Sequence, residues 1–186
     1  MTNPRNIVIA VSGLHGVGKT TQAKKIAEFF GLRHVSGGMI FRSLAESKNL
    51  SLLSLSEMAE NSDKIDRLID GAMVEEGKKG NVAIDSMLSA WFLEGIANIK
   101  IFLTMPDNVR IERIAKRDGR SYQEAYNETL GRESSEINRF KRYYNITLDD
   151  VKNMCDLVLS IQGLNEDEVF SILKYYIQIR LSNLGQ

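Results

Sequence analysis

The chain has 186 residues, with 24 acidic and 24 basic side chains and a formal net charge of zero. Its length suits one core domain, and the charge balance gives no general attraction to nucleic acid or to a membrane surface. One cysteine excludes an intramolecular disulfide, no apolar run is long enough to span a membrane, and residues 1–5 show no signal-peptide pattern. We therefore expect a cytoplasmic enzyme, either a monomer or a small homo-oligomer, without nucleic-acid or membrane partners.

The first predicted elements enclose a phosphate-binding motif. Residues 7–11 are apolar and mostly β-branched, which is typical of a buried strand, and residues 20–30 have helical apolar spacing. Between them, residues 13–20 match G-x-x-x-x-G-K-[ST], the P-loop. A strand, a glycine-rich turn and a helix in this order are the context that the motif requires. A chance glycine-rich turn with a lysine is the alternative, and these flanks argue against it.

The P-loop predicts binding of a nucleoside triphosphate such as ATP. Glycines let backbone N–H groups approach phosphate oxygens, and the following helix presents its positive end to the same anion. Lys19 is expected to reach the β- and γ-phosphates, and the Thr20 hydroxyl to ligate Mg²⁺. The predicted nucleotide-binding residues of this region are Gly13, Leu14, His15, Gly16, Val17, Gly18, Lys19, Thr20 and Thr21.

The remaining chain alternates between predicted strands and helices. Further strands are expected at 33–36, 82–85, 99–105 and 156–160. Helices are expected at 39–45, 54–59, 63–76, 107–117, 121–145 and 165–177, with N-caps at Ser54, Asp107, Ser121 and Asn165. This alternation predicts a three-layer α/β P-loop fold with a five-stranded parallel sheet.

The alternation of strands and helices also predicts how a single domain over residues 1–186 is divided. Helical pieces that fall outside this alternation are the expected moving parts. We expect a core at 5–38, 81–117 and 146–184, a helical insert at 39–80, and a lid at 118–145 that is mobile without ligand.

Asp85 closes the third predicted strand. The carboxyl ends of parallel strands share one edge of a sheet, so Asp85 is expected beside the P-loop, where it can hold Mg²⁺ directly or through water. The alternative is a helix N-cap for a segment starting near Met87.

Arginines are the remaining candidates. Arg42 follows the second strand by one helical turn and can clamp a phosphate, although alone it is more typical of a solvated surface. Arg113 and Arg117 share a helix face, and Arg132 and Arg139 recur at helical spacing among carboxylates. Such a helix is usually a solvated face, but phosphoryl transfer needs several cations around the γ-phosphate.

Together these patterns resemble the archaeal-type cytidylate kinases, a branch of the P-loop nucleoside monophosphate kinases. The resemblance covers nearly the whole chain. It is carried by residues 13–20, 35–42 (VSGGMIFR), 88–91 (LSAW), 112–117 (ERIAKR), 132–140 (RESSEINRF), 144–146 (YNI) and 156–158 (DLV), with Asp66 and Asp70.

The resemblance implies transfer of the ATP γ-phosphate to CMP or dCMP by direct in-line displacement. It implies that Arg42 holds the acceptor phosphate, that Arg113 covers the adenine, and that Arg117, Arg132 and Arg139 close over the phosphates. The implied catalytic residues are Lys19, Asp85, Arg117, Arg132 and Arg139. The implied acceptor-binding residues are Ser36, Gly37, Arg42, Asp85 and Met87, and the implied metal ligands are Thr20 and Asp85.

One departure stands after the third strand. Similar kinases have Glu-Gly-Arg where this chain has Asp85, Ser86 and Met87, so the arginine expected to contact the acceptor nucleotide is absent. Two alternatives follow. The chain is a kinase for another acceptor, such as AMP, UMP or a small metabolite, or it is a non-catalytic regulatory protein that binds ATP.

Overall fold

A computed structural model describes residues 6–183, without the side chain of residue 53. Residues 1–5 and residue 184, which ends the predicted core, lie outside this range. The strands are β1 (Val8–Ser12), β2 (Arg33–Ser36), β3 (Val82–Asp85), β4 (Ile99–Thr104) and β5 (Leu157–Ser160). The helices are α1 (Lys19–Phe30), α2 (Gly37–Ser47), α3 (Leu52–Asn61), α4 (Lys64–Lys78), α5 (Ser89–Phe92), α6 (Asp107–Asp118), α7 (Tyr122–Tyr144), α8 (Leu148–Asn153) and α9 (Glu166–Asn183).

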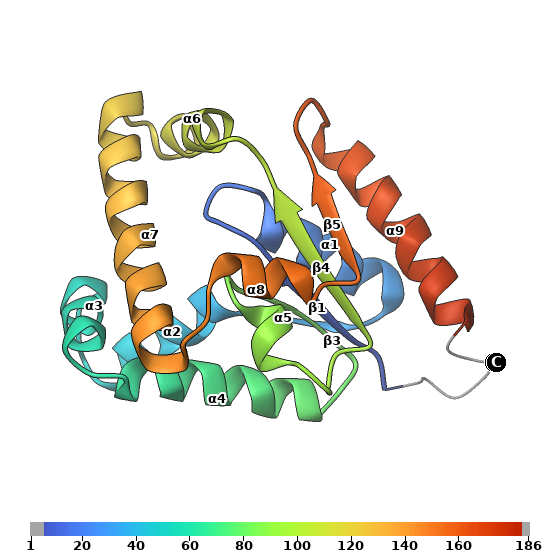
Figure 1. The fold of residues 1–186 in the computed structure, drawn as a ribbon, viewed down its shortest axis with the longest axis horizontal. Coiled ribbons are helices and arrows are strands. Elements are labelled where there is room, and N and C mark those ends of the chain that lie inside the picture. Colours follow the sequence, from blue (N-terminus) through green and yellow to red (C-terminus); the bar gives the residue numbers. More distant parts are fainter. Residues whose placement is uncertain (1–5, 184–186) are drawn as a thin grey trace.

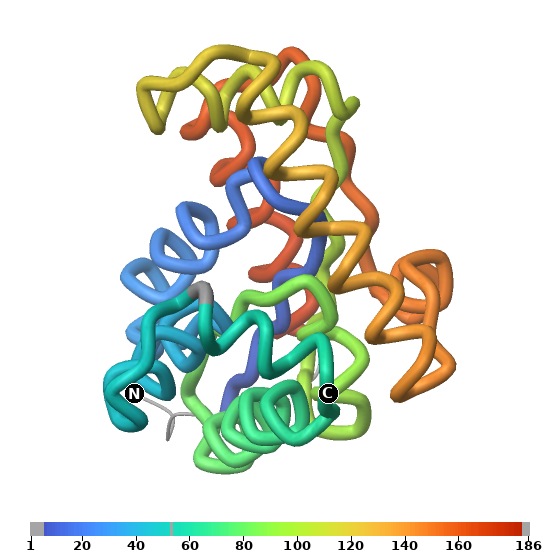
Figure 2. The backbone as a smooth tube through the Cα atoms, turned by 90° about the vertical axis from the view of Figure 1, so that its left-hand side faces the viewer, coloured from blue at the N-terminus to red at the C-terminus, as the bar shows by residue number. Residues whose placement is uncertain are grey.

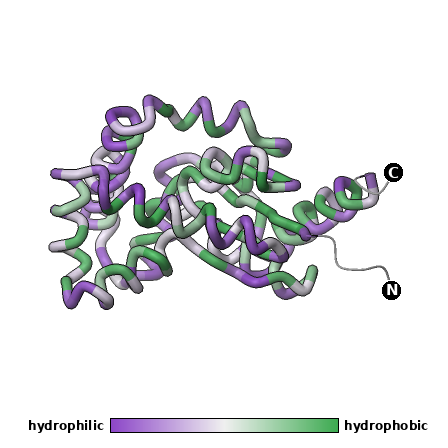
Figure 3. Tube along the Cα trace, turned by 90° about the horizontal axis from the view of Figure 1, so that it is seen from below, coloured by the Kyte–Doolittle hydropathy of each residue, from purple (hydrophilic) through white to green (hydrophobic). Residues whose placement is uncertain are grey.

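The strands form one parallel sheet in the order β2-β3-β1-β4-β5, so the predicted five-stranded parallel sheet is confirmed (Figure 1). Alternate residues of β1 belong to two hydrophobic cores, one on each face of the sheet. Ile9 and Val11 pack with α1 and α9 on one face, and Val8 and Ala10 pack with α2, α3 and α4 on the other. Along the outer helices, hydrophobic and hydrophilic segments alternate (Figure 3), as expected of helices that cover a sheet on one side only.

Three strand ends meet at one edge of this sheet. Asp85 lies in register with Val11 of β1 and with Ser36 of β2. The P-loop leaves β1 one residue later, and α2 begins directly after Ser36. The fold therefore places the P-loop, the Asp85 carboxylate and the first turn of α2 side by side.

The helix ends confirm two predicted N-caps and correct two others. Ser121 forms the expected capping box with Glu124, and Asn165 accepts from the backbone amides that open α9. The cap of α3 is Ser51, three residues before the predicted Ser54. Pro106, whose side chain has no polar atom, occupies the cap position of α6. The predicted cap, Asp107, lies inside the helix, and its carboxylate accepts from Arg110. The helices α5 and α8 were not predicted, since four and six residues are too few to show periodicity.

Helix α7 has 23 residues and stands apart from the sheet. It covers one side of the molecule, from α6 at one end to α3 and α4 at the other (Figure 1), and Figure 2 shows it crossing in front of the P-loop region. The predicted lid segment is therefore one long helix that reaches from the donor side to the insert. Within residues 6–183, none of the helices is both long and apolar enough to cross a bilayer.

Candidate active site

The P-loop has the backbone conformation that its glycines permit. Gly13, Gly16 and Gly18 have φ values of +143°, +79° and +83°. A Cβ on Gly13 would lie 2.4 Å from the Leu103 carbonyl oxygen, and one on Gly16 would lie 2.7 Å from the Arg110 carbonyl oxygen. Any other residue at these two positions would strain the loop and clash with backbone. Helix α1 begins at Lys19 without a side-chain cap, so its first N–H groups are left for an anion.

Lys19 is folded back onto its own loop. Its Nζ donates to the Leu14 carbonyl oxygen at 2.7 Å. Burial lowers the pKa of Lys19 to about 8, against the opposing influence of Asp85, Glu136 and Glu133. The Leu14 carbonyl thus holds the ammonium inside the loop, within reach of a phosphate bound there.

Asp85 is buried, and both of its carboxylate oxygens have partners. Oδ2 accepts from the Thr20 hydroxyl and Oδ1 contacts His34 Nε2, each at 2.7 Å. The alternative role as a helix N-cap is wrong, because α5 begins only at Ser89 and Leu88 precedes it. The hydroxyl and carboxylate oxygens at this point are ligands that Mg²⁺ accepts, so Thr20 and Asp85 fit the ion. His34 was missed as a neighbour of Asp85, although its place on the adjacent strand, two residues before Ser36, was a usable signal.

The P-loop opens onto a cleft of about 450 Å³. Its far wall consists of α6 and the segment between β5 and α9. Among the predicted nucleotide-binding residues, the cleft is lined by His15, Gly16, Val17, Gly18, Lys19, Thr20, Thr21, Arg113 and Arg117. The structure therefore brings the two α6 arginines to the same cavity as the loop, while Gly13 and Leu14 lie behind it.

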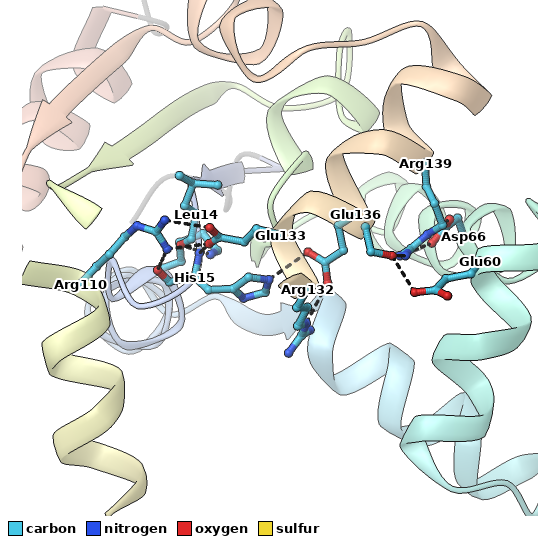
Figure 4. Close-up of polar contacts among 11 residues, drawn as sticks. Leu14, His15, Glu60, Asp66, Arg110, Arg132, Glu133, Glu136 and Arg139 are labelled. Atoms are coloured by element: carbon cyan, nitrogen blue, oxygen red, sulfur yellow. Dashed lines mark hydrogen bonds and ion pairs between the residues drawn. The ribbon is translucent and has the colours of Figure 1, made fainter. Parts of the chain in front are cut away.

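The predicted catalytic arginines are each paired with a carboxylate. Arg117 contacts Asp118. In α7, Arg132 contacts Glu136 at 2.9 Å, and Arg139 contacts Asp66 of α4 at 2.8 Å (Figure 4). Neither α7 arginine lines the cleft, although Arg132 lies near the P-loop, because its partner Glu136 contacts the His15 ring. To reach a phosphate, each would have to exchange its carboxylate for the ligand.

Two acids of α7 face the P-loop instead. Glu133 accepts from the His15 amide at 2.9 Å, and Glu136 contacts the His15 ring at 2.9 Å (Figure 4). Although burial acts to raise the pKa of Glu136, His15 and Arg132 hold it near 2. Arg110 of α6 forms a bidentate ion pair with Glu133, with bonds of 2.7 and 2.8 Å.

Sequence reasoning missed this buried pair. One signal was available for each member. Arg110 lies one turn from Ile114 on the buried face of α6, and Glu133 continues the four-residue spacing of the buried Ala125 and Thr129. A charged residue that continues a buried stripe of a helix needs a partner of opposite charge, and here Arg110 and Glu133 are partners of each other.

The predicted acceptor-binding residues lie in and beside the first turn of α2. Ser36 caps α2 by accepting from the Met39 amide, and Gly37 begins that helix against Ser86. Arg42 is exposed, and within residues 6–183 it has no carboxylate partner. A Cβ on Gly38 would lie 3.5 Å from its Nη1, so the guanidinium lies over the first turn of α2.

Met87 lies in an apolar cluster and is 7% exposed. Its neighbours include Phe102 and Ile146, so the thioether packs as a core side chain. The Ser86 hydroxyl beside it is buried, and among the described residues it has no hydrogen-bond partner. The role of Met87 toward an acceptor stays a prediction.

A second group of buried acids joins α4 to α7. Asp70 accepts from the Tyr144 hydroxyl at 2.5 Å, and Asp66 holds Arg139. Burial raises the pKa of Asp70 to about 7 and also raises the pKa of Asp66. The insert and the long helix are therefore joined by two acids whose pKa values are raised, and Asp70 titrates near neutral pH.

A five-stranded parallel sheet that carries this loop and its lysine defines a P-loop nucleotide-binding protein, and residues 9–140 match the family described as AAA domain. A cytidylate kinase of Staphylothermus marinus is 45% identical over 172 residues, which cover 92% of this chain and 97% of that protein. One of Pyrococcus horikoshii is 41% identical over 168 residues, covering 90% and 86%. The chain belongs to the cytidylate kinase family.

Solved structures support the fold at lower identity. A shikimate kinase of Bacteroides thetaiotaomicron has a TM-score of 0.62 at 14% identity, covering 92% of this chain and 98% of that one. A protein of Eubacterium ventriosum described as uncharacterized has a TM-score of 0.70 at 18% identity, with the same coverage. These likenesses extend over the whole α/β domain.

Proposed function

We propose that the protein transfers the γ-phosphate of ATP to CMP or dCMP. The observation that carries this proposal is the shared sheet edge. The P-loop, Asp85 and the first turn of α2 lie beside one another there, so a donor and an acceptor can meet at one point. Membership of the cytidylate kinase family supports the choice of acceptor.

On the donor side, the P-loop amides and Lys19 hold the β- and γ-phosphates. Arg113 lies beside the adenine in the cleft, and Arg117 adds positive charge nearer the phosphates. The lowered pKa of Lys19 reflects a buried ammonium, and an incoming polyphosphate compensates that charge better than a carbonyl does.

On the acceptor side, we assign the insert 39–80 to CMP and the segment 118–145 to the lid. Arg42 clamps the acceptor phosphate near Ser36 and Gly37. Arg132 and Arg139 leave Glu136 and Asp66 when both substrates are bound, and then face the transferring group. Because α7 is docked at both ends, this lid works by exchanging ion-pair partners more than by swinging away as a body.

Mg²⁺ bound near Thr20 and Asp85 would neutralise charge on the donor phosphates. In the transfer itself, an oxygen of the acceptor phosphate forms a bond to the γ-phosphorus while the bond from that phosphorus to the β–γ bridging oxygen breaks. ADP leaves with the electron pair, and CMP becomes CDP. The residues position the two anions and balance their charge, and the acceptor, already anionic, needs no general base.

Met87 supports one alternative acceptor class. Without the family's arginine, base choice rests on fewer charged contacts, so UMP or AMP is the competing acceptor. Initial rates of ADP release with CMP, dCMP, UMP, AMP and GMP separate these possibilities. We expect the highest kcat/KM for CMP or dCMP, and none for Lys19→Ala with any acceptor. A higher value for AMP or UMP would overturn the proposed acceptor, and binding of ATP without transfer to any of them would favour a regulatory role.

A further inference from the structure

The buried ion pair between α6 and α7 holds both polar groups of one P-loop residue. Arg110 is 1% exposed and Glu133 is 3% exposed. Glu133 Oε1 accepts from the His15 amide at 2.9 Å, and Arg110 Nη1 donates to the His15 carbonyl oxygen at 3.2 Å. The pair therefore holds the two peptide units that flank the His15 Cα.

The geometry of the peptide bond then determines where the Leu14 C=O and the Gly16 N–H point. Among the described residues all peptide bonds are trans, and in a trans peptide the C=O and the N–H point opposite ways. Since the His15 N–H points at Glu133, the Leu14 C=O points to the inside of the loop, where it accepts from Lys19 at 2.7 Å. Since the His15 C=O points at Arg110, the Gly16 N–H also points inward, and within residues 6–183 nothing accepts a hydrogen bond from it.

We propose that Arg110 and Glu133 are positioning residues for the donor phosphates: they fix the peptide planes on both sides of His15, so that the Gly16 N–H faces the nucleotide and the Leu14 carbonyl holds Lys19 in place. This inference deepens the donor half of the proposed function and rests on it. The His15 N–H is thereby withdrawn from the phosphate cradle.

The bidentate pair also fixes the spacing of the two groups that it holds. A guanidinium and a carboxylate joined by two parallel bonds hold a carbonyl and an amide at a set distance from each other. Arg110 has a further partner, since its Nε donates to Asp107 at 2.9 Å. Helix α6 itself packs closely on the loop, because a Cβ on Gly16 would lie 2.8 Å from Ile114 Cδ1.

The first test removes both charges together. Arg110→Met/Glu133→Leu leaves no unpaired buried charge, and such replacements are often neutral for stability. Isothermal titration with ADP, and with a non-hydrolysable ATP analogue plus Mg²⁺, measures the donor site alone. We expect about ten- to a hundredfold weaker binding, with an unchanged KM for the acceptor. The matched control is Arg120→Met/Glu128→Leu, which removes an exposed ion pair at the same helix junction and should bind donors as the parent does.

A folded double variant with unchanged donor affinity would overturn the proposal, because the pair would then serve stability alone. If the double variant does not fold, a second measurement on the unaltered protein decides. Amide hydrogen exchange followed by NMR should find His15 protected without nucleotide, and Gly16 protected only when ADP is added. Protection of the His15 amide that depends on ADP contradicts the withdrawal of that amide from the cradle.

These tests separate the inference from the proposed function. Both use donor nucleotides without an acceptor, so they can succeed even if CMP is not the substrate. Failure to phosphorylate any monophosphate would reject the proposed function and leave the positioning role of Arg110 and Glu133 standing.

Discussion

The donor side and the acceptor side of this sheet edge are built by different means. The predicted donor site consists mainly of backbone groups. Three glycines at positive φ form the loop, and buried side chains hold the His15 backbone from outside the loop. The predicted acceptor site consists mainly of side chains. Arg42 is exposed and unpaired within residues 6–183, while Asp66 and Asp70 contact residues of α7. We therefore expect a donor site that is formed before ligand arrives and an acceptor site that is completed by exchange of ion-pair partners.

The difference teaches where specificity can change. A backbone cradle recognises phosphate, which all nucleoside triphosphates share, and it tolerates little variation. Paired side chains can be replaced one at a time without disturbing the loop. We therefore expect substitutions on the donor side to abolish transfer, and substitutions on the acceptor side to change which monophosphate is used and how tightly.

The largest effect is expected from Lys19→Ala. Within the P-loop, Lys19 is the sole source of positive side-chain charge at neutral pH other than a protonated His15, so transfer should fall on the order of 10³-fold or more. The fold should survive, because Lys19 belongs to no apolar core cluster and its partner is a loop carbonyl. Steady-state rates and a melting curve on the same preparation check both points. Near-normal turnover by the folded variant would contradict a mechanism in which Lys19 holds the donor phosphates.

Arg42→Met tests the acceptor side alone. Loss of a charge-assisted contact to phosphate should raise the KM for CMP about ten- to a hundredfold. The KM for ATP should not change, and the melting temperature should stay within a degree or two, since no ion pair is lost. Lys48→Met, an exposed cation at the end of the same helix, is the control. An equal increase in the KM for CMP and in the KM for ATP would contradict the assignment of Arg42 to the acceptor site alone.

Met87→Arg sharpens the acceptor comparison. If the family's arginine contacts the acceptor, restoring it should lower the KM for CMP about tenfold, and more than for AMP or UMP. A stability cost is also expected, because Met87 lies in an apolar cluster and a charge there must reach solvent or ligand. Met87→Leu serves as the control for packing. A strong CMP preference in the parent, with no gain in the variant, would show that another group fills this role.

The smallest effect concerns the contact between α4 and α7. Burial raises the pKa of Asp70 from its ordinary 3.8 to about 7, so the folded state binds this proton more tightly than the unfolded chain. The stabilisation is complete below about pH 4 and is lost as the pH rises through 7. Asp70→Asn keeps an acceptor for Tyr144 and removes the titration. Its melting temperature should exceed that of the parent at pH 8 by about 5–10 °C more than it does at pH 5.

Melting curves across pH 5–8 measure this difference. Glu57→Gln, which changes an exposed acid on α3, should leave the pH dependence of the parent unchanged. A parent whose stability rises from pH 5 to pH 8 relative to Asp70→Asn would contradict the sign, and with it the buried, partly protonated state of Asp70.

The fold and the donor site were largely predictable, for a physical reason. Strand periodicity, the glycine spacing and the capping boxes are local, so residues near in sequence carry the signal. The loop at 13–20, the place of Asp85 and the sheet of five parallel strands all follow from such local patterns and were confirmed.

The contacts across the molecule were less predictable. Arg110 and Glu133 are 23 residues apart, and Asp66 and Arg139 are 73 apart, so no local spacing pairs them. The caps of α3 and α6 were mispredicted for a different reason, because several polar residues compete locally for one position. Ser51 and Ser54 carry the same hydroxyl three residues apart, and the Asp107 carboxylate pairs with Arg110 one turn further along the same helix.

One competition experiment tests the central claim most directly. ATP and Mg²⁺ are mixed with equal amounts of CMP, UMP and AMP in one tube, and ³¹P NMR follows the nucleoside diphosphates as they form. The ratio of initial rates then reports the ratio of kcat/KM values without separate calibrations. The account predicts that CDP appears first, in step with ADP, and that Lys19→Ala forms none. Appearance of inorganic phosphate without CDP, or consumption of AMP ahead of CMP, would contradict it.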